Sequence, residues 1–187
     1  MFRVVTACLV IGSYTIRLLY RRRFPKRSAP SVPVDGAVWI VILWPASLIF
    51  YISVGTMHRL AIPIPIWARW AGVAVFVLDL VLFRWVYATL GRNFSAKLEL
   101  FDDHELVDAG PYRWVRHPMY ATLFLSALSS CLISANLVVV ASTTMLITAM
   151  TLRIRKEERM MRRRFRGKYL AYELRTGKIF PRMNLFR

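Results

Sequence analysis

The stretch MYATLFLSALSSCLISANLVVVASTTMLITAMTL, residues 119–152, contains no charged side chain. A helix crosses the hydrocarbon core of a bilayer with about 20 apolar residues, in a range of roughly 17–25, so this stretch is too long for one crossing. Ser134-Ala135-Asn136 interrupts it with residues that suit a turn and a helix N-cap. We therefore expect a hairpin of two spans, 118–133 and 137–152, each about 24 Å long.

The composition of the whole chain agrees with a membrane protein. Of its 187 residues 57% are hydrophobic, and the mean hydropathy is +0.43. Soluble domains are about 45–50% apolar. The formal charge of +17 could indicate a nucleic-acid partner, but basic charge combined with long apolar runs favours cytoplasmic loops and anionic lipid head groups. We expect anionic membrane lipids as partners and no nucleic acid.

Three further apolar runs precede the hairpin, at 4–20, 37–57 and 67–90. The prediction for residues 1–187 is thus a single all-α, polytopic membrane domain with about five transmembrane helices. A cytoplasmic C-terminal helix and tail, 153–187, would follow the last span. The three histidines are scattered and both cysteines, Cys8 and Cys131, lie in apolar stretches as small buried hydrophobes, so no metal site is expected.

Lysine and arginine in the loops predict the orientation. The connector RRRFPKR, residues 21–27, is strongly basic, and the tail from Arg153 carries thirteen Lys or Arg against three acids. Four crossings separate the two regions, so both can be cytoplasmic. This predicts an integral protein of a plasma or inner membrane, with its N-terminus outside and its C-terminus inside. The acidic segment 91–117 would lie on the same side as the tail and pack against it.

The helix after the last span has two carboxylates beside its apolar stripe. On a wheel of 100° per residue, the stripe runs through Ile154, Met161 and Phe165, and Glu157 and Glu158 lie at its edges. A buried acid needs a partner. Either these glutamates turn inward to a site, or they make ordinary contacts within the helix, Glu157 with Arg153 and Glu158 with Arg162.

A second cluster of polar residues, GPYRWVRHPMY at 110–120, precedes the fourth span. Pro118 suits the first helical turn and His117 its N-cap, where unpaired N–H groups and the helix dipole attract anions. Alternatively the two arginines anchor lipid phosphates and the aromatic residues form an interfacial belt; these are Tyr112, Arg113, Trp114, Arg116 and Tyr120.

Several polar residues lie within the predicted spans. Thr122, Ser126 and Ser130 recur every four residues, a spacing that favours close helix packing and would also leave room for a ligand. Asp79 and Arg84 are ionisable groups in the third span, where charge is costly. Arg84 is close enough to the end of its span to reach the head groups, whereas the pattern assigns no role to Asp79.

Five motifs follow one another over about half of the chain: LGRNFSAKLEL (90–100), HELVDAGPYRWVRHPMY (104–120), RIRKEERMMRRRF (153–165), KYLAY (168–172) and FPR (180–182). Taken in this order, they resemble the superfamily of integral-membrane methyltransferases that contains the isoprenylcysteine carboxyl methyltransferases and the phospholipid methyltransferases. The resemblance implies that the C-terminal helical region binds S-adenosyl-L-methionine at the cytoplasmic face. The cofactor-binding residues carried over are Tyr112, Arg116, His117, Pro118, Tyr120, Glu157 and Glu158.

The implied activity is methyl transfer to a lipophilic, isoprenoid-like or lipid-like acceptor that enters from the bilayer, most simply carboxyl O-methylation. A carboxylate acceptor is already ionised at pH 7 and needs an arginine, Arg153 or Arg116, to position it. An amine of a phospholipid head group would need a base instead, and Glu158 or Glu157 could serve. The catalytic candidates are thus Glu158, Glu157 and Arg153. An NADPH-dependent reductase of the sterol type and a non-catalytic lipid-binding protein are the alternatives.

Overall fold

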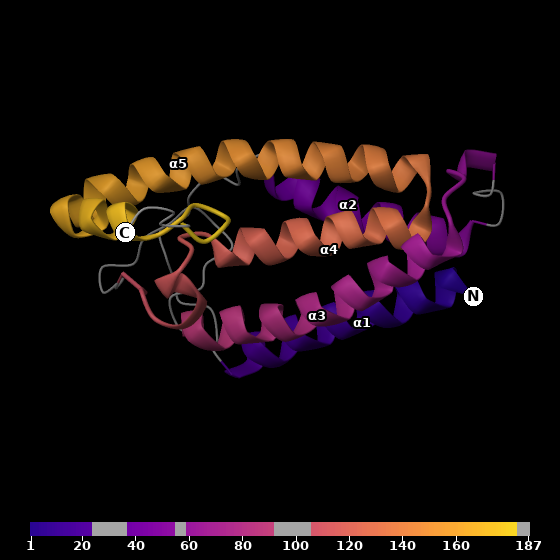
Figure 1. Ribbon diagram of the computed structural model, residues 1–187, viewed down its shortest axis with the longest axis horizontal. Coiled ribbons are helices and arrows are strands. Elements are labelled where there is room, and N and C mark those ends of the chain that lie inside the picture. Colours follow the sequence, from indigo (N-terminus) through magenta and orange to yellow (C-terminus); the bar gives the residue numbers. More distant parts are fainter. Residues whose placement is uncertain (24–36, 55–58, 92–105, 183–187) are drawn as a thin grey trace.

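The computed structural model describes residues 1–23, 37–54, 59–91 and 106–182. These residues form five α-helices, and Figure 1 shows that successive helices run back and forth along the long axis. The chain begins at one end of the bundle and finishes at the other (Figure 1). We name these the N-terminal end and the C-terminal end. The helices are α1 (Phe2–Arg23), α2 (Ala37–Ser53), α3 (Ile66–Leu90), α4 (Pro118–Ser134) and α5 (Leu137–Arg175), with a short 3-10 helix, η3 (Gly110–Arg113), before α4.

The all-α fold with five helices is confirmed, with two changes at the boundaries. In the described part of the chain, α1, α3 and α5 are long and apolar enough to cross a membrane, and α4 is a shorter apolar helix. The second helix stops at Ser53, and residues 55–57 of the predicted span lie outside the described residues. The helix that the sequence predicts from residue 153 is continuous with the last span, because α5 runs from Leu137 into the basic segment.

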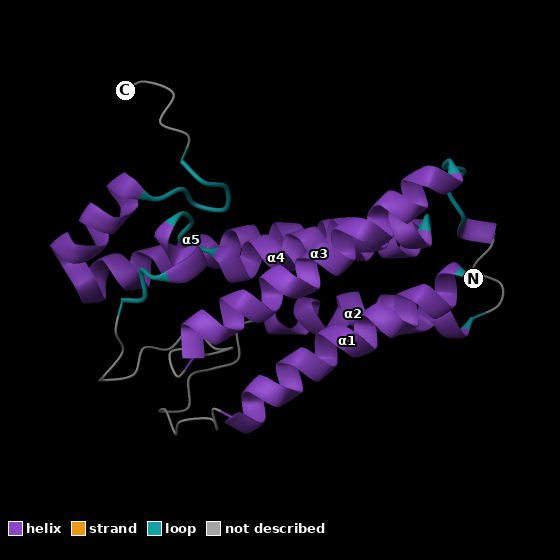
Figure 2. Ribbon diagram, turned by 60° about the horizontal axis from the view of Figure 1, so that its bottom comes forward, coloured by secondary structure: helices purple, strands orange, loops and turns teal. Residues whose placement is uncertain are grey.

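A sharp change of direction does occur later in α5, at Arg166. Its backbone has φ 44° and ψ −120°, which is not helical, and a positive φ is uncommon for any residue other than glycine. The final turns of α5 consequently fold back at the C-terminal end (Figure 2). Residues 176–182, which we call the strap, then follow α5.

The turn between α4 and α5 forms where the sequence predicts it. Ala135 is left-handed, with φ 46°, and ends α4. The side chain of Asn136 accepts a hydrogen bond of 3.0 Å from the Val138 N–H and so caps α5. From α3, Arg69 reaches this turn: its guanidinium donates to the Ile133 carbonyl at 2.7 and 2.9 Å and stacks 3.9 Å from the centre of the Phe2 ring.

Close packing of α3 on α4 is the main helix contact of the bundle. At Gly72 an added Cβ would lie 2.8 Å from the Leu132 Cβ, so only glycine permits this approach. Helix α2 packs against α5 through Leu48, Tyr51 and Val139. Many large apolar side chains are exposed around the outside, as expected of a surface that faces lipid. Cys8 is also exposed, which corrects the expectation that it is buried.

Candidate functional site

The site lies at the C-terminal end, where the start of α4 meets the second half of α5. Gly110 has φ 54°, and its Cα faces Thr89 so closely that a Cβ would meet Oγ1 at 2.6 Å, so the turn into η3 requires glycine. His117 is the N-cap residue of α4 and Pro118 its first residue. The His117 side chain makes no capping hydrogen bond, because it turns toward α5 instead.

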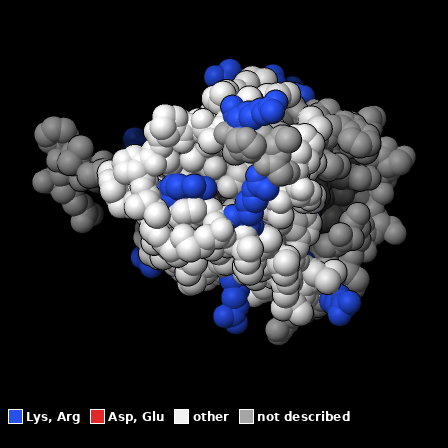
Figure 3. Space-filling model, turned by 90° about the vertical axis from the view of Figure 1, so that its right-hand side faces the viewer, with Lys and Arg blue, Asp and Glu red and all other residues white. Residues whose placement is uncertain are grey.

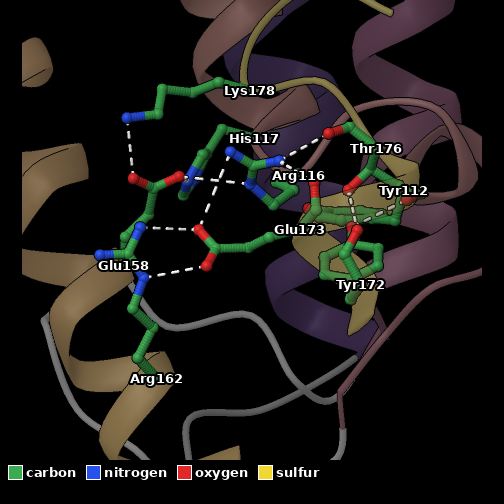
Figure 4. A network of polar contacts seen from close by, with 9 residues as sticks. All are labelled: Tyr112, Arg116, His117, Glu158, Arg162, Tyr172, Glu173, Thr176 and Lys178. Atoms are coloured by element: carbon green, nitrogen blue, oxygen red, sulfur yellow. Dashed lines mark hydrogen bonds and ion pairs between the residues drawn. The ribbon is translucent and has the colours of Figure 1, made fainter. Parts of the chain in front are cut away.

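Glu158 is the centre of the polar network drawn in Figure 4. Its carboxylate is buried, with 5% of the side chain exposed. One oxygen, Oε1, lies 3.3 Å from Arg116 Nε and 3.4 Å from His117 Nε2. The other, Oε2, lies 2.8 Å from Lys178 Nζ on the strap. Residues that are distant in sequence therefore meet at one carboxylate.

The electrostatics of Glu158 follow from these partners. Burial alone would raise the pKa of the carboxyl group, but the contacts with His117 and Lys178 outweigh it and lower the pKa to about 2. Glu158 is therefore ionised throughout the physiological pH range. His117 Nε2 is buried, and at 3.4 Å from Glu158 it makes no well-formed hydrogen bond to any described residue. It remains available to a further partner.

Glu157 faces a second, aromatic part of the site. Its Oε2 accepts a hydrogen bond of 2.7 Å from the Tyr120 hydroxyl. Burial, and next the nearby Glu157 carboxylate, raise the pKa of the Tyr112 phenol. Arg153 is buried one helical turn before Glu157 and lies within reach of the Tyr120 hydroxyl. Glu157 thus contacts α4, whereas Glu158 contacts the residues just before α4 and the strap.

Residues after the kink of α5 complete the network, and the sequence gives little sign of them. Arg116 donates to the backbone carbonyls of Glu173, at 3.1 Å, and Thr176, at 2.6 Å. Glu173 in turn accepts two hydrogen bonds from Arg162, at 2.8 and 2.9 Å. KYLAY in the sequence indicates the buried Tyr169 and Tyr172, but no pattern singles out Glu173, Thr176 or Lys178.

These contacts decide between several expectations from the sequence. Of the two alternatives for Glu158, the pairing with Arg162 was wrong, because Arg162 pairs with Glu173 across the kink. The described part of segment 91–117 does pack against the end of the chain, for example through the ion pair of Asp108 with Arg175. The other acids of that segment, Glu99, Asp102, Asp103 and Glu105, lie outside the described residues.

The polar residues within the spans do not reach this site. Asp79 is fully buried on α3 and accepts a hydrogen bond from Ser126 of α4. Thr122 and Ser130 donate to carbonyls of their own helix, at 2.9 and 2.8 Å. The stripe of small residues therefore serves the packing of α4. Arg84 is exposed.

Comparison with known proteins adds independent information. A sequence model of the isoprenylcysteine carboxyl methyltransferase family matches residues 72–163. The chain is 32% identical over 118 residues to a protein-S-isoprenylcysteine O-methyltransferase of Tribolium castaneum, covering 62% of this chain and 42% of that protein. It is 37% identical over 60 residues to the uncharacterized protein YpbQ of Bacillus subtilis, covering 32% and 36%.

A solved structure agrees with these matches. The structure of the eukaryotic intramembrane Ras methyltransferase ICMT superposes with a TM-score of 0.58 at 25% identity, over 95% of this chain and 67% of that one. The chain is thus similar to the isoprenylcysteine carboxyl methyltransferases, in sequence over residues 72–163 and in fold over most of its length. The superfamily match covers both glutamates, Arg153 and the Arg-His-Pro stretch, whereas Glu173 and the strap lie beyond it. The chain spans less than half the length of the two relatives named above.

Proposed function

We propose that this protein is an integral-membrane methyltransferase that uses S-adenosyl-L-methionine to methylate a carboxylate on a lipophilic acceptor. The observation that carries the proposal is the meeting of Arg116 and His117 with Glu158, beside the pair of Tyr120 and Glu157, at one end of the bundle. These side chains belong to the stretch that the superfamily model matches. The names of the relatives favour an S-prenylated cysteine as the acceptor.

The chemistry of these residues fits the cofactor. When bound, S-adenosyl-L-methionine supplies an electrophilic methyl group on a sulfonium, together with an amino-acid end that has one carboxylate and one ammonium. His117 Nε2 is a buried polar atom that lacks a well-formed hydrogen bond, and it can donate to the carboxylate. Glu157 and Glu158 can accept from the ammonium and from the ribose hydroxyls. Tyr112, Pro118 and Tyr120 would line the same pocket, and the tyrosine rings can stabilise a cation.

The low pKa of Glu158 disfavours this residue as the base that N-methylation would need. An amine acceptor must lose a proton, and a general base acts best when its pKa is near the working pH. Contacts with His117 and Lys178, which outweigh burial, hold the pKa of Glu158 near 2, so this carboxylate is a weak base. A carboxylate acceptor needs no base and requires only that its oxygen be held in line with the methyl group.

Arg153, beside the Tyr120 hydroxyl, is placed to hold that acceptor. The Arg116 guanidinium contacts Glu158 and two backbone carbonyls. Arg153 is buried in α5 directly after the apolar part of the helix, where an acceptor entering from the bilayer would present its polar end. In this proposal Arg153 positions the acceptor, while Arg116 fixes the shape of the cofactor site.

We further propose that residues 1–187 form one membrane domain, with the C-terminal end of the bundle in the cytoplasm. The charge distribution supports this, since the tail from Arg153 carries thirteen Lys or Arg against three acids and would meet anionic lipids there. Figure 3 shows the opposite end, where a few basic side chains and no Asp or Glu are visible among the described residues. A reporter fused after Arg187 should be cytoplasmic, and one fused before Met1 should not.

Calorimetry on the purified protein tests the proposed function. We expect S-adenosylhomocysteine to bind with a dissociation constant in the micromolar range, about −8 kcal/mol, and Glu158→Gln or His117→Ala to weaken binding at least tenfold. The unaltered protein should transfer a labelled methyl group from S-adenosyl-L-methionine to an S-prenylated cysteine with a free carboxylate. The two variants should transfer it more slowly. Saturable binding of NADPH without S-adenosylhomocysteine binding would contradict the proposal and favour a reductase, and binding of neither would favour a lipid-binding protein.

A further inference from the structure

The strap brings to Glu158 a cation that the proposed function does not use. We propose that Lys178 competes with the ammonium group of the cofactor's amino-acid end for Glu158, and so sets the affinity for S-adenosyl compounds. This inference depends on the proposed cofactor site. It assigns a role in binding to a residue outside the stretch that matches the superfamily model.

The geometry distinguishes Lys178 from the other partners of Glu158. Arg116 and His117 contact Oε1, and their side chains are only 11% and 4% exposed. Lys178 contacts Oε2 at 2.8 Å, and 46% of its side chain is exposed. The inner oxygen is therefore held by buried groups, whereas the outer oxygen is held by a flexible side chain that solvent can reach. A ligand ammonium can reach Glu158 most readily at Oε2.

Replacement of the Lys178 ammonium by a ligand ammonium requires only a side-chain movement. The backbone of the strap is fixed: Arg116 N donates to Gly177 O at 2.8 Å, His117 N to Lys178 O at 3.0 Å, and Gly177 N to Trp114 O at 3.0 Å. Opening the strap would break all three hydrogen bonds, whereas moving the Lys178 ammonium into water breaks one partly exposed ion pair, which is the cheaper change. The strap therefore stays in place while Lys178 yields its position.

The charges around the carboxylate favour this exchange. Arg116 already balances Glu158 at Oε1, so Lys178 adds a second positive charge to one carboxylate. A ligand ammonium at Oε2 restores the same balance once Lys178 has moved into solvent. Removing the lysine charge leaves Glu158 with Arg116, so the carboxylate stays paired and should accept the ligand without competition.

Calorimetric titration of Lys178→Met with S-adenosylhomocysteine tests the inference. We expect about fivefold tighter binding than in the unaltered protein, the effect of removing one partly exposed competing ion pair. Lys178→Arg, which keeps the charge, should bind no more tightly than the unaltered protein. The probe 5′-methylthioadenosine lacks the amino-acid end, so its affinity should be the same in all three proteins.

Lys168→Met is the matched control, because it removes one exposed lysine charge from the final turns of α5 without touching Glu158. Its affinity for S-adenosylhomocysteine should not change. Melting temperatures in detergent show whether each variant folds, and Lys178→Gln replaces Lys178→Met if the latter does not. Weaker binding by a folded Lys178→Met would overturn the inference and make Lys178 a partner of the ligand carboxylate. Unchanged binding would overturn it as well, whereas no binding by the unaltered protein would overturn the proposed function itself.

Discussion

Both ends of the bundle are organised by an arginine that reaches across to another helix, but the two arginines have different partners. At the N-terminal end, Arg69 of α3 donates to the carbonyls that end α4 and stacks on Phe2. At the C-terminal end, Arg116 also donates to the carbonyls that end a helix, those of Glu173 and Thr176, and in addition contacts the Glu158 carboxylate.

The two ends differ in whether the acceptor groups can exchange a protein partner for a ligand. Carbonyl oxygens at the end of a helix belong to the backbone and need a donor in every state of the protein. A carboxylate can exchange one cation for another, and Glu158 has one partner, Lys178, that is nearly half exposed. We therefore expect changes at Arg69 to affect stability alone, and changes around Glu158 to affect both stability and binding.

The largest expected effect concerns the pH dependence of stability. Burial opposes the ionisation of Glu158, but its contacts with His117 and Lys178 lower the pKa in the folded state to about 2 from an ordinary value of 4.5. A depressed pKa stabilises the fold above the unfolded-state pKa, and this contribution, about 3 kcal/mol, is lost as the pH falls from about 4.5 toward 2. The melting temperature of the unaltered protein should drop more steeply between pH 5 and pH 3 than that of Glu158→Gln. Parallel curves would show that Glu158 is not the group responsible.

Next in size is the loss of the arginine at the other end. Arg69→Met removes charged hydrogen bonds to Ile133 and the stacking on Phe2, which should cost about 2 kcal/mol and lower the melting temperature by about 4–8 °C. The N-terminal and C-terminal ends lie at opposite ends of the bundle (Figure 1). Since Glu158 belongs to the network at the C-terminal end, the folded variant should bind S-adenosylhomocysteine with unchanged affinity. Weakened binding would mean that the two ends are coupled, and the expectation that Arg69 affects stability alone would be wrong.

A smaller effect is expected midway between the two ends. Ser126→Ala removes the hydrogen bond that Asp79 accepts, and the other carboxyl oxygen of Asp79 has no partner among the described residues. A buried polar group left without its hydrogen bond costs about 1–2 kcal/mol, so the melting temperature should fall, whereas Asp79→Asn, which keeps an acceptor, should change it little. If Ser126→Ala reduces the affinity for S-adenosylhomocysteine instead, Asp79 acts on the site and not only on packing.

The sequence is sufficient to predict much of the bundle, because lipid permits few structures. An uncharged stretch longer than one crossing, with Ser134-Ala135-Asn136 near its middle, determines the hairpin of α4 and α5. Glycine before Pro111 and proline at 118 likewise mark the turn and the helix start that the structure shows. Polar residues in apolar surroundings are rare in such a chain, so the two glutamates and the Arg-His-Pro stretch are noticeable in the sequence alone.

The sequence could not predict the partners that come from the end of the chain. A helical wheel assumes one continuous helix, and the positive φ of Arg166 breaks that assumption just before Tyr169, Tyr172 and Glu173. The strap reaches Glu158 through backbone hydrogen bonds of Gly177 and Lys178, which have no signature in side-chain pattern. For the same reason the sequence left open a pairing of Glu158 with Arg162, although the kink gives Arg162 another carboxylate.

The smallest expected effect separates two surface ion pairs at the C-terminal end. Arg162 donates two hydrogen bonds to Glu173, whose side chain is only 12% exposed, whereas Arg175 pairs with Asp108 where both side chains are at least half exposed. Exposed ion pairs with one contact contribute little to stability, and bidentate ion pairs with a shielded carboxylate contribute more. Arg162→Met should therefore lower the melting temperature by about 1–2 °C, and Arg175→Met should leave it unchanged. Glu173 also lies 3.9 Å from Arg116, so only Arg162→Met should slightly weaken S-adenosylhomocysteine binding. Equal effects of both variants on binding would show that the kinked end of α5 contributes to the site through its overall charge and not through the contact of Arg162 with Glu173.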